Sequence, residues 1–191
     1  MSITVRARPL EPSRARLLQR LRVPLGFVFG ALFLIFAAPS EPRFSVGMAV
    51  ALGGLLLRVW AAGHLRKHTA LAQSGPYRWT RNPLYLGSFF LGLGFSLAAG
   101  VWWFMPLFLA LFGALYIPVM RREEEELRQA YGGEYLRYMA GVPFFLPRRP
   151  PREGPTSQGF AWRRVLLNRE YNAAIGYLLL GAYLLWRGQV S

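Results

Sequence analysis

Long apolar runs separated by short polar or basic segments dominate the pattern of this chain. The runs cover residues 23–38, 44–63, 84–99, 101–120 and 173–186. A transmembrane helix needs about 20 apolar residues, and the first, third and last runs fall short of that length. Aromatic residues and arginines at their ends, or local thinning of the bilayer, make up the difference. The pattern predicts an all-α, polytopic integral membrane helical bundle with about five transmembrane helices.

The remaining pattern fits one membrane-embedded domain over residues 1–191, with an irregular, Pro-rich stretch after the fourth run. Residues 160–171 follow that stretch and have the composition of a short helix at the membrane interface, with a tryptophan anchor and arginines towards the headgroups. Residues 148–191 are therefore expected to form a C-terminal interfacial segment and the last span. Glu170, Tyr171 and Asn172 lie at the entry of that span, where the alternatives are contact with substrate or, as we expect, an ordinary helix start.

The distribution of positive charge predicts the orientation of the bundle. The net charge is +14, with 22 arginines and one lysine, and the pI is near 11.3. Residues 1–22 carry six arginines and residues 121–172 carry ten, whereas Arg43 and Arg187 alone lie on the opposite side. The positive-inside rule places the N-terminus in the cytoplasm, retained as a first helix. Arginines that flank apolar runs indicate contact with membrane lipids, and not with nucleic acid.

A polar, aromatic and Pro-rich segment lies between the second and third runs, where a membrane boundary is expected. Its sequence is Gly75-Pro76-Tyr77-Arg78-Trp79-Thr80-Arg81-Asn82-Pro83-Leu84-Tyr85. Its two prolines fix φ and remove amide donors, and the residues before them are biased towards extended backbone. We expect a non-helical path that offers backbone groups to a ligand, with Tyr77, Trp79 and Tyr85 as apolar walls.

A run of glutamates, residues 123–126, follows the fourth apolar run on the same side of the membrane. Neighbouring residues of a helix point 100° apart, so at most two of the four carboxylates face one site. The alternative is a solvated helix with pairs such as Glu124 and Arg128. Only the region around Gly100 joins the third and fourth runs, which predicts a tight antiparallel hairpin. That hairpin would bring the glutamates close to the polar segment.

Two further sets of polar residues lie within the second apolar run and directly after it. Arg58 interrupts the run, and an arginine within a membrane span either reaches towards the interface or serves a function. His64 and His68 are spaced like half of a metal site. No third ligand lies nearby and the chain has no cysteine, so we expect no metal.

Taken together, these segments resemble a known family. Four motifs follow one another along the chain: Gly75-Pro76-Tyr77, Arg81-Asn82-Pro83-Leu84-Tyr85, the pair Glu123-Glu124, and the repeat of Tyr131-Gly132, Tyr135 and Tyr138. In this order they look like the isoprenylcysteine carboxyl methyltransferase and phospholipid methyltransferase superfamily. The resemblance covers about residues 50–147. Asn82 stands where many members have histidine, and Tyr131 replaces the usual phenylalanine.

The resemblance implies an integral membrane enzyme that transfers a methyl group from S-adenosylmethionine to a lipophilic, membrane-embedded acceptor. It implies a cofactor site formed by Tyr77, Arg81, Asn82, Pro83, Tyr85, Glu123 and Glu124. As catalytic residues we expect Arg81, Glu124 and Arg58, with an arginine positioning a carboxylate acceptor or a glutamate serving the proton of an amine acceptor. The sequence does not separate these two chemistries, and it does not indicate the oligomeric state.

Two other functions remain open at this point. One is a membrane reductase that binds NADPH, related to the sterol reductases, although those enzymes are longer and have more spans. The other is a non-enzymatic membrane scaffold with a lipid-binding cytoplasmic face. The expected location in every case is a multi-pass position in a bacterial inner membrane, with the polar segments facing the cytoplasm.

Overall fold

The structure, a computed structural model, describes residues 12–66, 70–148 and 159–190, with side chains from residue 24 onward. Every element in these ranges is helical. They are α1 (Pro12–Phe36), α2 (Arg43–His64), the 3₁₀ helix η1 (Gly75–Arg78), α3 (Pro83–Ala98), α4 (Phe104–Tyr131), α5 (Gly133–Gly141), α6 (Trp162–Leu167) and α7 (Tyr171–Val190). The predicted all-α bundle is confirmed, and each apolar run lies on one of its long helices. The histidine pair is incomplete here because His68 falls outside the described residues, as do the first eleven residues of the chain.

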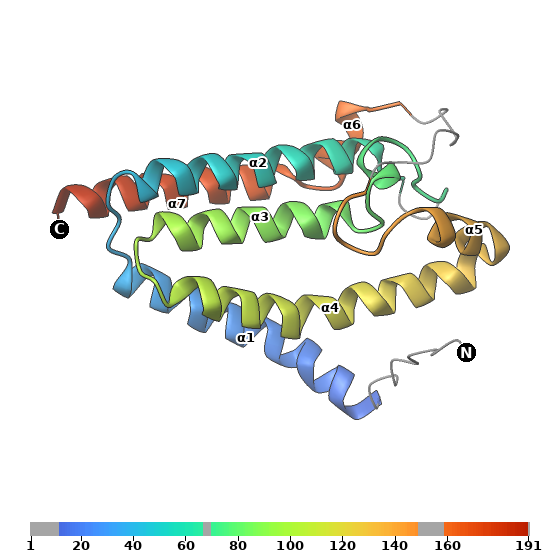
Figure 1. The fold of residues 1–191 in the computed structure, drawn as a ribbon, viewed down its shortest axis with the longest axis horizontal. Helices are drawn as coiled ribbons and strands as arrows, with labels where there is room; N and C mark the ends of the chain where they lie inside the picture. Colours follow the sequence, from blue (N-terminus) through green and yellow to red (C-terminus); the bar gives the residue numbers. More distant parts are fainter. Residues whose placement is uncertain (1–11, 67–69, 149–158, 191) are drawn as a thin grey trace.

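The long helices are arranged so that the polar segments gather at one end of the bundle (Figure 1). The C-terminal ends of α2 and α4, together with η1, α5 and α6, lie at that end, whereas α7 finishes at the other. The helices therefore alternate in direction as the charge pattern predicts. This alternation brings segments far apart in sequence into one polar region.

The closest helix contact in the bundle is between α2 and α3, through glycines. A Cβ at Gly54 would lie 2.4 Å from the backbone N of Leu91, and one at Gly94 would lie 2.3 Å from the backbone N of Ala51. Small residues allow helix backbones to approach in this way in a membrane, where van der Waals contact replaces the hydrophobic effect as the force between helices. The small residues of the third apolar run therefore serve helix packing.

The expected tight hairpin of α3 and α4 is not the main contact. These helices are joined at Gly100, whose φ is +76°, but α4 diverges from α3 towards the polar end (Figure 1). The reason is that α3 presents glycines to α2, whereas between α3 and α4 bulky rings meet, such as Phe89 and Phe112 with centroids 5.1 Å apart. Large side chains hold the two backbones apart.

Two helices, α2 and α4, are long and apolar enough to cross a membrane. The apolar part of α1 and helix α3 are shorter, and α7 does not reach the same standard within the described residues. At its far end α4 extends beyond the apolar part into the glutamate run and ends at Gly132, whose φ is +49°. The fold is thus that of a helical membrane bundle, in which two helices are long and apolar enough to span a membrane and shorter apolar helices lie around them.

The contact of α2 with α3 generates a test. Replacing Gly54 by leucine should destabilise the protein by about 3 kcal/mol or more, because overpacking a tight contact forces the backbones apart. The thermal unfolding midpoint in detergent measures the effect. Gly53→Leu is the matched control, since a Cβ at Gly53 meets nothing within 4 Å. Equal midpoints for the two variants would contradict this packing.

Candidate functional site

The centre of the candidate site is an ion pair between Arg81 and Glu124. Arg81 comes just before α3, and Glu124 lies on the extension of α4 beyond its apolar part. The Arg81 Nε and Glu124 Oε1 atoms are 2.7 Å apart, and both side chains are about nine-tenths buried, with exposures of 11% and 10%. Arg81 also donates a hydrogen bond from Nη1 to the carbonyl of Met139 at 3.3 Å. The pair thus joins the polar segment to α4 and α5.

Three polar atoms at this pair are buried without an aligned hydrogen bond among the described residues. They are Arg81 Nε, Glu124 Oε1 and the Tyr135 hydroxyl. The first two touch as charges, but the N–H does not point at the oxygen. Buried polar groups are normally hydrogen-bonded, so these atoms are candidates for contact with a polar ligand.

The segment after α5 holds the polar segment in place. The amide N–H of Arg81 donates to the carbonyl of Pro143 at 2.9 Å, and the side-chain amide of Asn82 donates to the carbonyl of Phe144 at 2.9 Å. Asn82 is buried and directly precedes α3, whose first residue is Pro83. Asn82 therefore fixes the start of α3 through its side chain, and Pro83 begins the helix where no amide donor is needed.

The backbone of the polar segment differs in one respect from the sequence prediction. Gly75 is not extended but has a φ of +58°, and residues 75–78 form a 3₁₀ turn. The physical reason is space, because a Cβ at Gly75 would lie 2.6 Å from the ring of His64. His64 is buried and shares a hydrogen bond of 2.9 Å with Ser74. The glycine thus lets the chain turn tightly over the histidine.

The structure divides the glutamate run into two pairs. Glu124 faces Arg81, and Glu123 accepts a hydrogen bond of 2.7 Å from the Tyr85 hydroxyl. The other pair, Glu125 and Glu126, is exposed and forms ion pairs along the helix surface, Glu125 with Arg128 and Glu126 with Arg122. The possible pair of Glu124 and Arg128 is therefore wrong, because Glu124 turns inwards. Within the glutamate run, Glu123 and Glu124 are therefore the two that contact other predicted site residues, Tyr85 and Arg81.

Buried tyrosines line the other side of the polar segment. The Tyr138 hydroxyl donates a hydrogen bond of 2.7 Å to the carbonyl of Tyr77. Burial raises the pKa of Tyr77 well above its usual range, and the negative charges of Glu123 and Glu170 raise it further. Burial likewise raises the pKa of Tyr138 and of Tyr135, the latter with help from Glu124. These phenols stay protonated, and the Tyr138 hydroxyl is thereby kept as a hydrogen-bond donor to the Tyr77 carbonyl. Glu123, Glu170 and Arg58 all lie within electrostatic range of the Tyr77 hydroxyl.

Arg58, the arginine within α2, forms a bidentate ion pair with Glu170. Its Nε and Nη2 each donate to a carboxylate oxygen of Glu170 at 2.9 Å. Its Nη1 donates to the Ser88 hydroxyl and to the carbonyl of Leu84 at 3.4 Å. Glu170 is only 4% exposed, and it directly precedes α7. The pair therefore ties α2, α3 and α7 together at the polar end.

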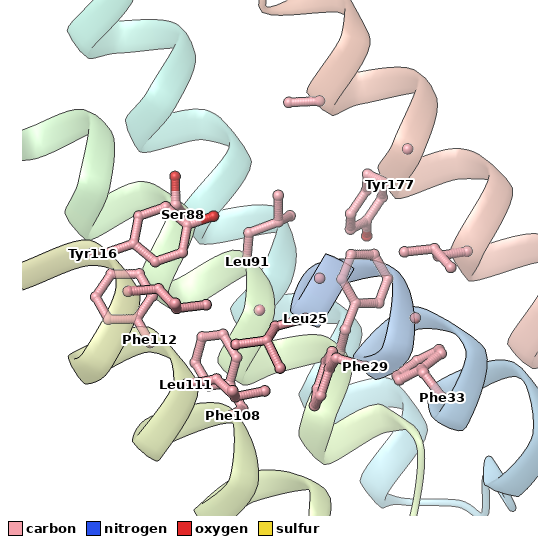
Figure 2. A pocket seen from close by; sticks show the side chains of 18 of the residues that line it. Leu25, Phe29, Phe33, Ser88, Leu91, Phe108, Leu111, Phe112, Tyr116 and Tyr177 are labelled. Atoms are coloured by element: carbon pink, nitrogen blue, oxygen red, sulfur yellow. The ribbon is translucent and has the colours of Figure 1, made fainter. Parts of the chain in front are cut away.

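An apolar cavity of about 500 Å³ begins next to this pair and lies between α1, α3, α4 and α7. We call it the bundle cavity. Its walls are mostly leucines, phenylalanines and glycines, and Ser88 and Tyr116 lie together at one end (Figure 2). Ser88 contacts Arg58, and the ring of Tyr116 packs against that of Tyr85 with centroids 5.9 Å apart. The polar end of the bundle cavity therefore adjoins the pair of Arg58 and Glu170 and, through Tyr85, the carboxylate of Glu123, and its volume suits a small molecule.

The sequence analysis placed most of these residues in one region but did not identify all of them. The structure brings together the predicted residues Tyr77, Arg81, Asn82, Pro83, Tyr85, Glu123 and Glu124. Arg58 lies within electrostatic range of Tyr77. Glu170 was expected to be an ordinary helix start, and its ion pair was missed. One signal was present, because an arginine within an apolar helix requires a carboxylate and the chain has only nine acidic residues.

Comparison with known proteins shows which family part of the chain resembles. Residues 42–134, just under half of the chain, match the model of the phospholipid methyltransferase family. This region contains α2, η1 and α3 and the whole glutamate run. The match confirms the resemblance to the membrane methyltransferase superfamily that the sequence motifs indicated. The chain is thus similar to membrane methyltransferases over residues 42–134.

Two curated proteins are similar to part of the chain. The nickel-cobalt-cadmium resistance protein NccN of Alcaligenes xylosoxydans xylosoxydans is 34% identical over 57% of this chain and 52% of its own length. The cobalt-zinc-cadmium resistance protein CzcN of Cupriavidus metallidurans is 34% identical over 54% of this chain and 47% of its own length. The chain thus spans about half the length of the curated relatives that it matches. No solved structure matches it significantly.

The ion pair of Arg58 and Glu170 generates a second prediction. Glu170→Gln should lower the free energy of unfolding by about 3 kcal/mol, because it leaves a largely buried guanidinium without its counter-ion. Combining it with Arg58→Met should cost less than the sum of the two single changes. A double-mutant cycle of unfolding in detergent measures the coupling. The exposed pair of Arg122 and Glu126 is the control and should couple by less than about 1 kcal/mol.

The buried tyrosines predict the behaviour at alkaline pH. The unfolded chain releases the Tyr138 proton near pH 10, while the folded protein holds it, so the stability of the fold decreases as the pH rises above about 10. Tyr138→Phe should lose about 1 kcal/mol at neutral pH and then decline less steeply with alkali. Thermal unfolding as a function of pH measures both effects. The exposed Tyr171→Phe is the control, and equal slopes for wild type and Tyr138→Phe would contradict the prediction.

Proposed function

We propose that this protein is an S-adenosylmethionine-dependent methyltransferase that acts on a lipophilic acceptor embedded in the membrane. The observation that carries the proposal is the buried pair of Arg81 and Glu124 with its cluster of polar atoms that lack aligned hydrogen bonds. Both residues of the pair lie within the matched family region, and Tyr85, which donates to the neighbouring Glu123, packs against Tyr116 at the polar end of the apolar cavity.

The residues present fit S-adenosylmethionine by their chemistry. Glu123 and Glu124 offer carboxylates to ribose hydroxyls or to an ammonium group, and Arg81 offers a guanidinium to a carboxylate. The rings of Tyr85 and Tyr77 offer apolar faces to the adenine and to a sulfonium. Asn82 and Pro83 take part through the backbone of the turn that they fix, since the Asn82 side chain is engaged with Phe144.

When bound, S-adenosylmethionine supplies a methyl group on a positively charged sulfur, which needs no further activation. The task of the chain is to align the donor with the acceptor and to keep water out. The buried Arg81, Glu124 and Tyr135 fix one side of the site, and the Tyr138 bond to the Tyr77 carbonyl fixes the polar segment. The bundle cavity takes the apolar part of the acceptor and leaves its head at the Ser88 end.

The chemistry of the acceptor head is left with two candidates, a carboxylate and an amine. Two guanidinium groups are candidates to position a carboxylate, those of Arg81 and Arg58. Each already has a glutamate partner. A carboxylate acceptor would therefore have to share or displace Glu124 or Glu170. An amine acceptor would find those carboxylates available as hydrogen-bond acceptors and as a route for its proton.

The alternatives are a reductase that binds NADPH and a scaffold without a catalytic role. The family match supports methyl transfer over both. The names of the metal-resistance relatives do not change this choice, because the relatives align over only about half of their own length. We place the protein in a bacterial inner membrane as a multi-pass protein, with the site facing the cytoplasm, on the strength of the arginine distribution.

Calorimetric titration of the detergent-solubilised protein with S-adenosylhomocysteine tests the proposal. We expect saturable binding, and about tenfold or more weaker binding in Glu124→Gln, because one charge-assisted hydrogen bond is lost. Glu125→Gln is the matched control on the exposed face of the same helix and should bind like wild type.

The other outcomes are equally informative. NADPH serves as the competing ligand, and binding of NADPH alone would favour the reductase. Binding of neither ligand by folded protein would favour the scaffold. Equal affinity of Glu124→Gln and Glu125→Gln for S-adenosylhomocysteine would overturn the assignment of Glu124 to the cofactor site, even if the protein proved to be a methyltransferase.

A further inference from the structure

The bundle cavity is built from two sets of helices with different relations to the family match. Helices α3 and α4 contribute Ser88, Tyr116 and several phenylalanine rings, and the residues named lie within the matched region. Helices α1 and α7 contribute the opposite wall, and both lie outside that region. The likeness to the family therefore covers the polar end of the cavity but not the wall that faces it.

The outlying wall contains glycines that serve no helix contact. A Cβ at Gly26 or Gly30 of α1, or at Gly176 of α7, would meet nothing within 4 Å. Gly92 of α3, on the same cavity, is different, because a Cβ there would lie 2.3 Å from the ring of Phe108. Glycine weakens a helix, so a glycine with free space beside it needs a reason other than packing. At these positions the glycines widen the cavity.

The shape and polarity of the cavity indicate what it holds. Among the described residues no charged one lines it, and the hydroxyls of Ser88 and Tyr116 lie together at one end (Figure 2). The third hydroxyl, that of Tyr177, lies apart from them and donates to the carbonyl of Met48 at 3.3 Å. A molecule with a hydrocarbon chain and one polar head matches this arrangement. The head would lie beside Arg58 and Tyr85, and the chain would extend between α1 and α7.

We propose that α1 and α7 select the hydrocarbon chain of the methyl acceptor, with Gly26, Gly30 and Gly176 as the specificity-determining positions. The inference rests on the proposed function, since it takes the occupant of the cavity to be the acceptor. It assigns the choice of acceptor to helices outside the matched region. Family membership alone then does not reveal the acceptor.

Photolabelling of the protein in lipid nanodiscs tests the inference. The probes are linear alkanols of increasing length that carry a diazirine at the methyl end, and mass spectrometry locates the label. In wild type we expect label on α1 and α7. In Gly176→Leu the labelling by the longest probes should fall about tenfold or more, because leucine takes up the volume of several methylene groups and overpacking a filled cavity is unfavourable. Short probes should still label this variant.

A second variant and a control keep the result interpretable. Gly30→Leu narrows the same cavity from α1 and should have the same effect if Gly176→Leu fails to fold. Gly53→Leu adds the same side chain to α2, also where a Cβ meets nothing within 4 Å, but away from the cavity, and should label like wild type. Unchanged labelling of both cavity variants by every probe would overturn the inference.

Titration of the same variants with S-adenosylhomocysteine separates this inference from the proposed function. We expect Gly176→Leu to keep the cofactor affinity of wild type. Normal cofactor affinity with unchanged probe labelling would overturn only the selection of the chain. Absence of cofactor binding in wild type would overturn the proposed function, and with it the assignment of the chain to a methyl acceptor.

Discussion

Arginines placed among apolar helices must find carboxylates, and this constraint organises the polar end of the protein. A charge in a low-dielectric surrounding is costly unless it is paired and hydrogen-bonded. Arg58 meets the constraint through Glu170, and Arg81 meets it through Glu124. The pair of Arg58 and Glu170 joins α2 to the start of α7. The pair of Arg81 and Glu124 joins the polar segment to the extension of α4. Both pairs depend on long-range folding.

The two pairs differ in how completely they are satisfied. All three donating nitrogens of Arg58 have partners, so its role includes holding α2, α3 and α7 together. The pair of Arg81 and Glu124 instead leaves buried polar atoms beside Tyr135 without aligned bonds. An incompletely satisfied cluster is less stable than a fully bonded one and is suited to receive a ligand. This difference is why the cofactor site is proposed at the second pair and a head-group position at the first.

Packing between helices sets the space in which an acceptor lies. Glycines draw α2 and α3 into backbone contact, whereas aromatic rings keep α4 apart from α3. The bundle cavity occupies part of the resulting space, and α1 and α7 close it. Glycine therefore has two opposite effects in one bundle. At Gly54 and Gly94 it brings helices together, and at Gly176 it leaves a volume unfilled.

The sequence by itself determined the helical class, the positions of the long helices and the membership of the polar cluster. Apolar runs and prolines are local signals, and the motif order from Tyr77 to Glu124 carried the family resemblance. Only the tertiary structure decided which glutamates turn inwards, that α3 packs on α2 more closely than on α4, and that Glu170 neutralises Arg58. These outcomes depend on rotation and approach of helices far apart in the chain, which periodicity within one helix does not specify. For the same reason the cavity, which four helices share, has no signature in the sequence of any one of them.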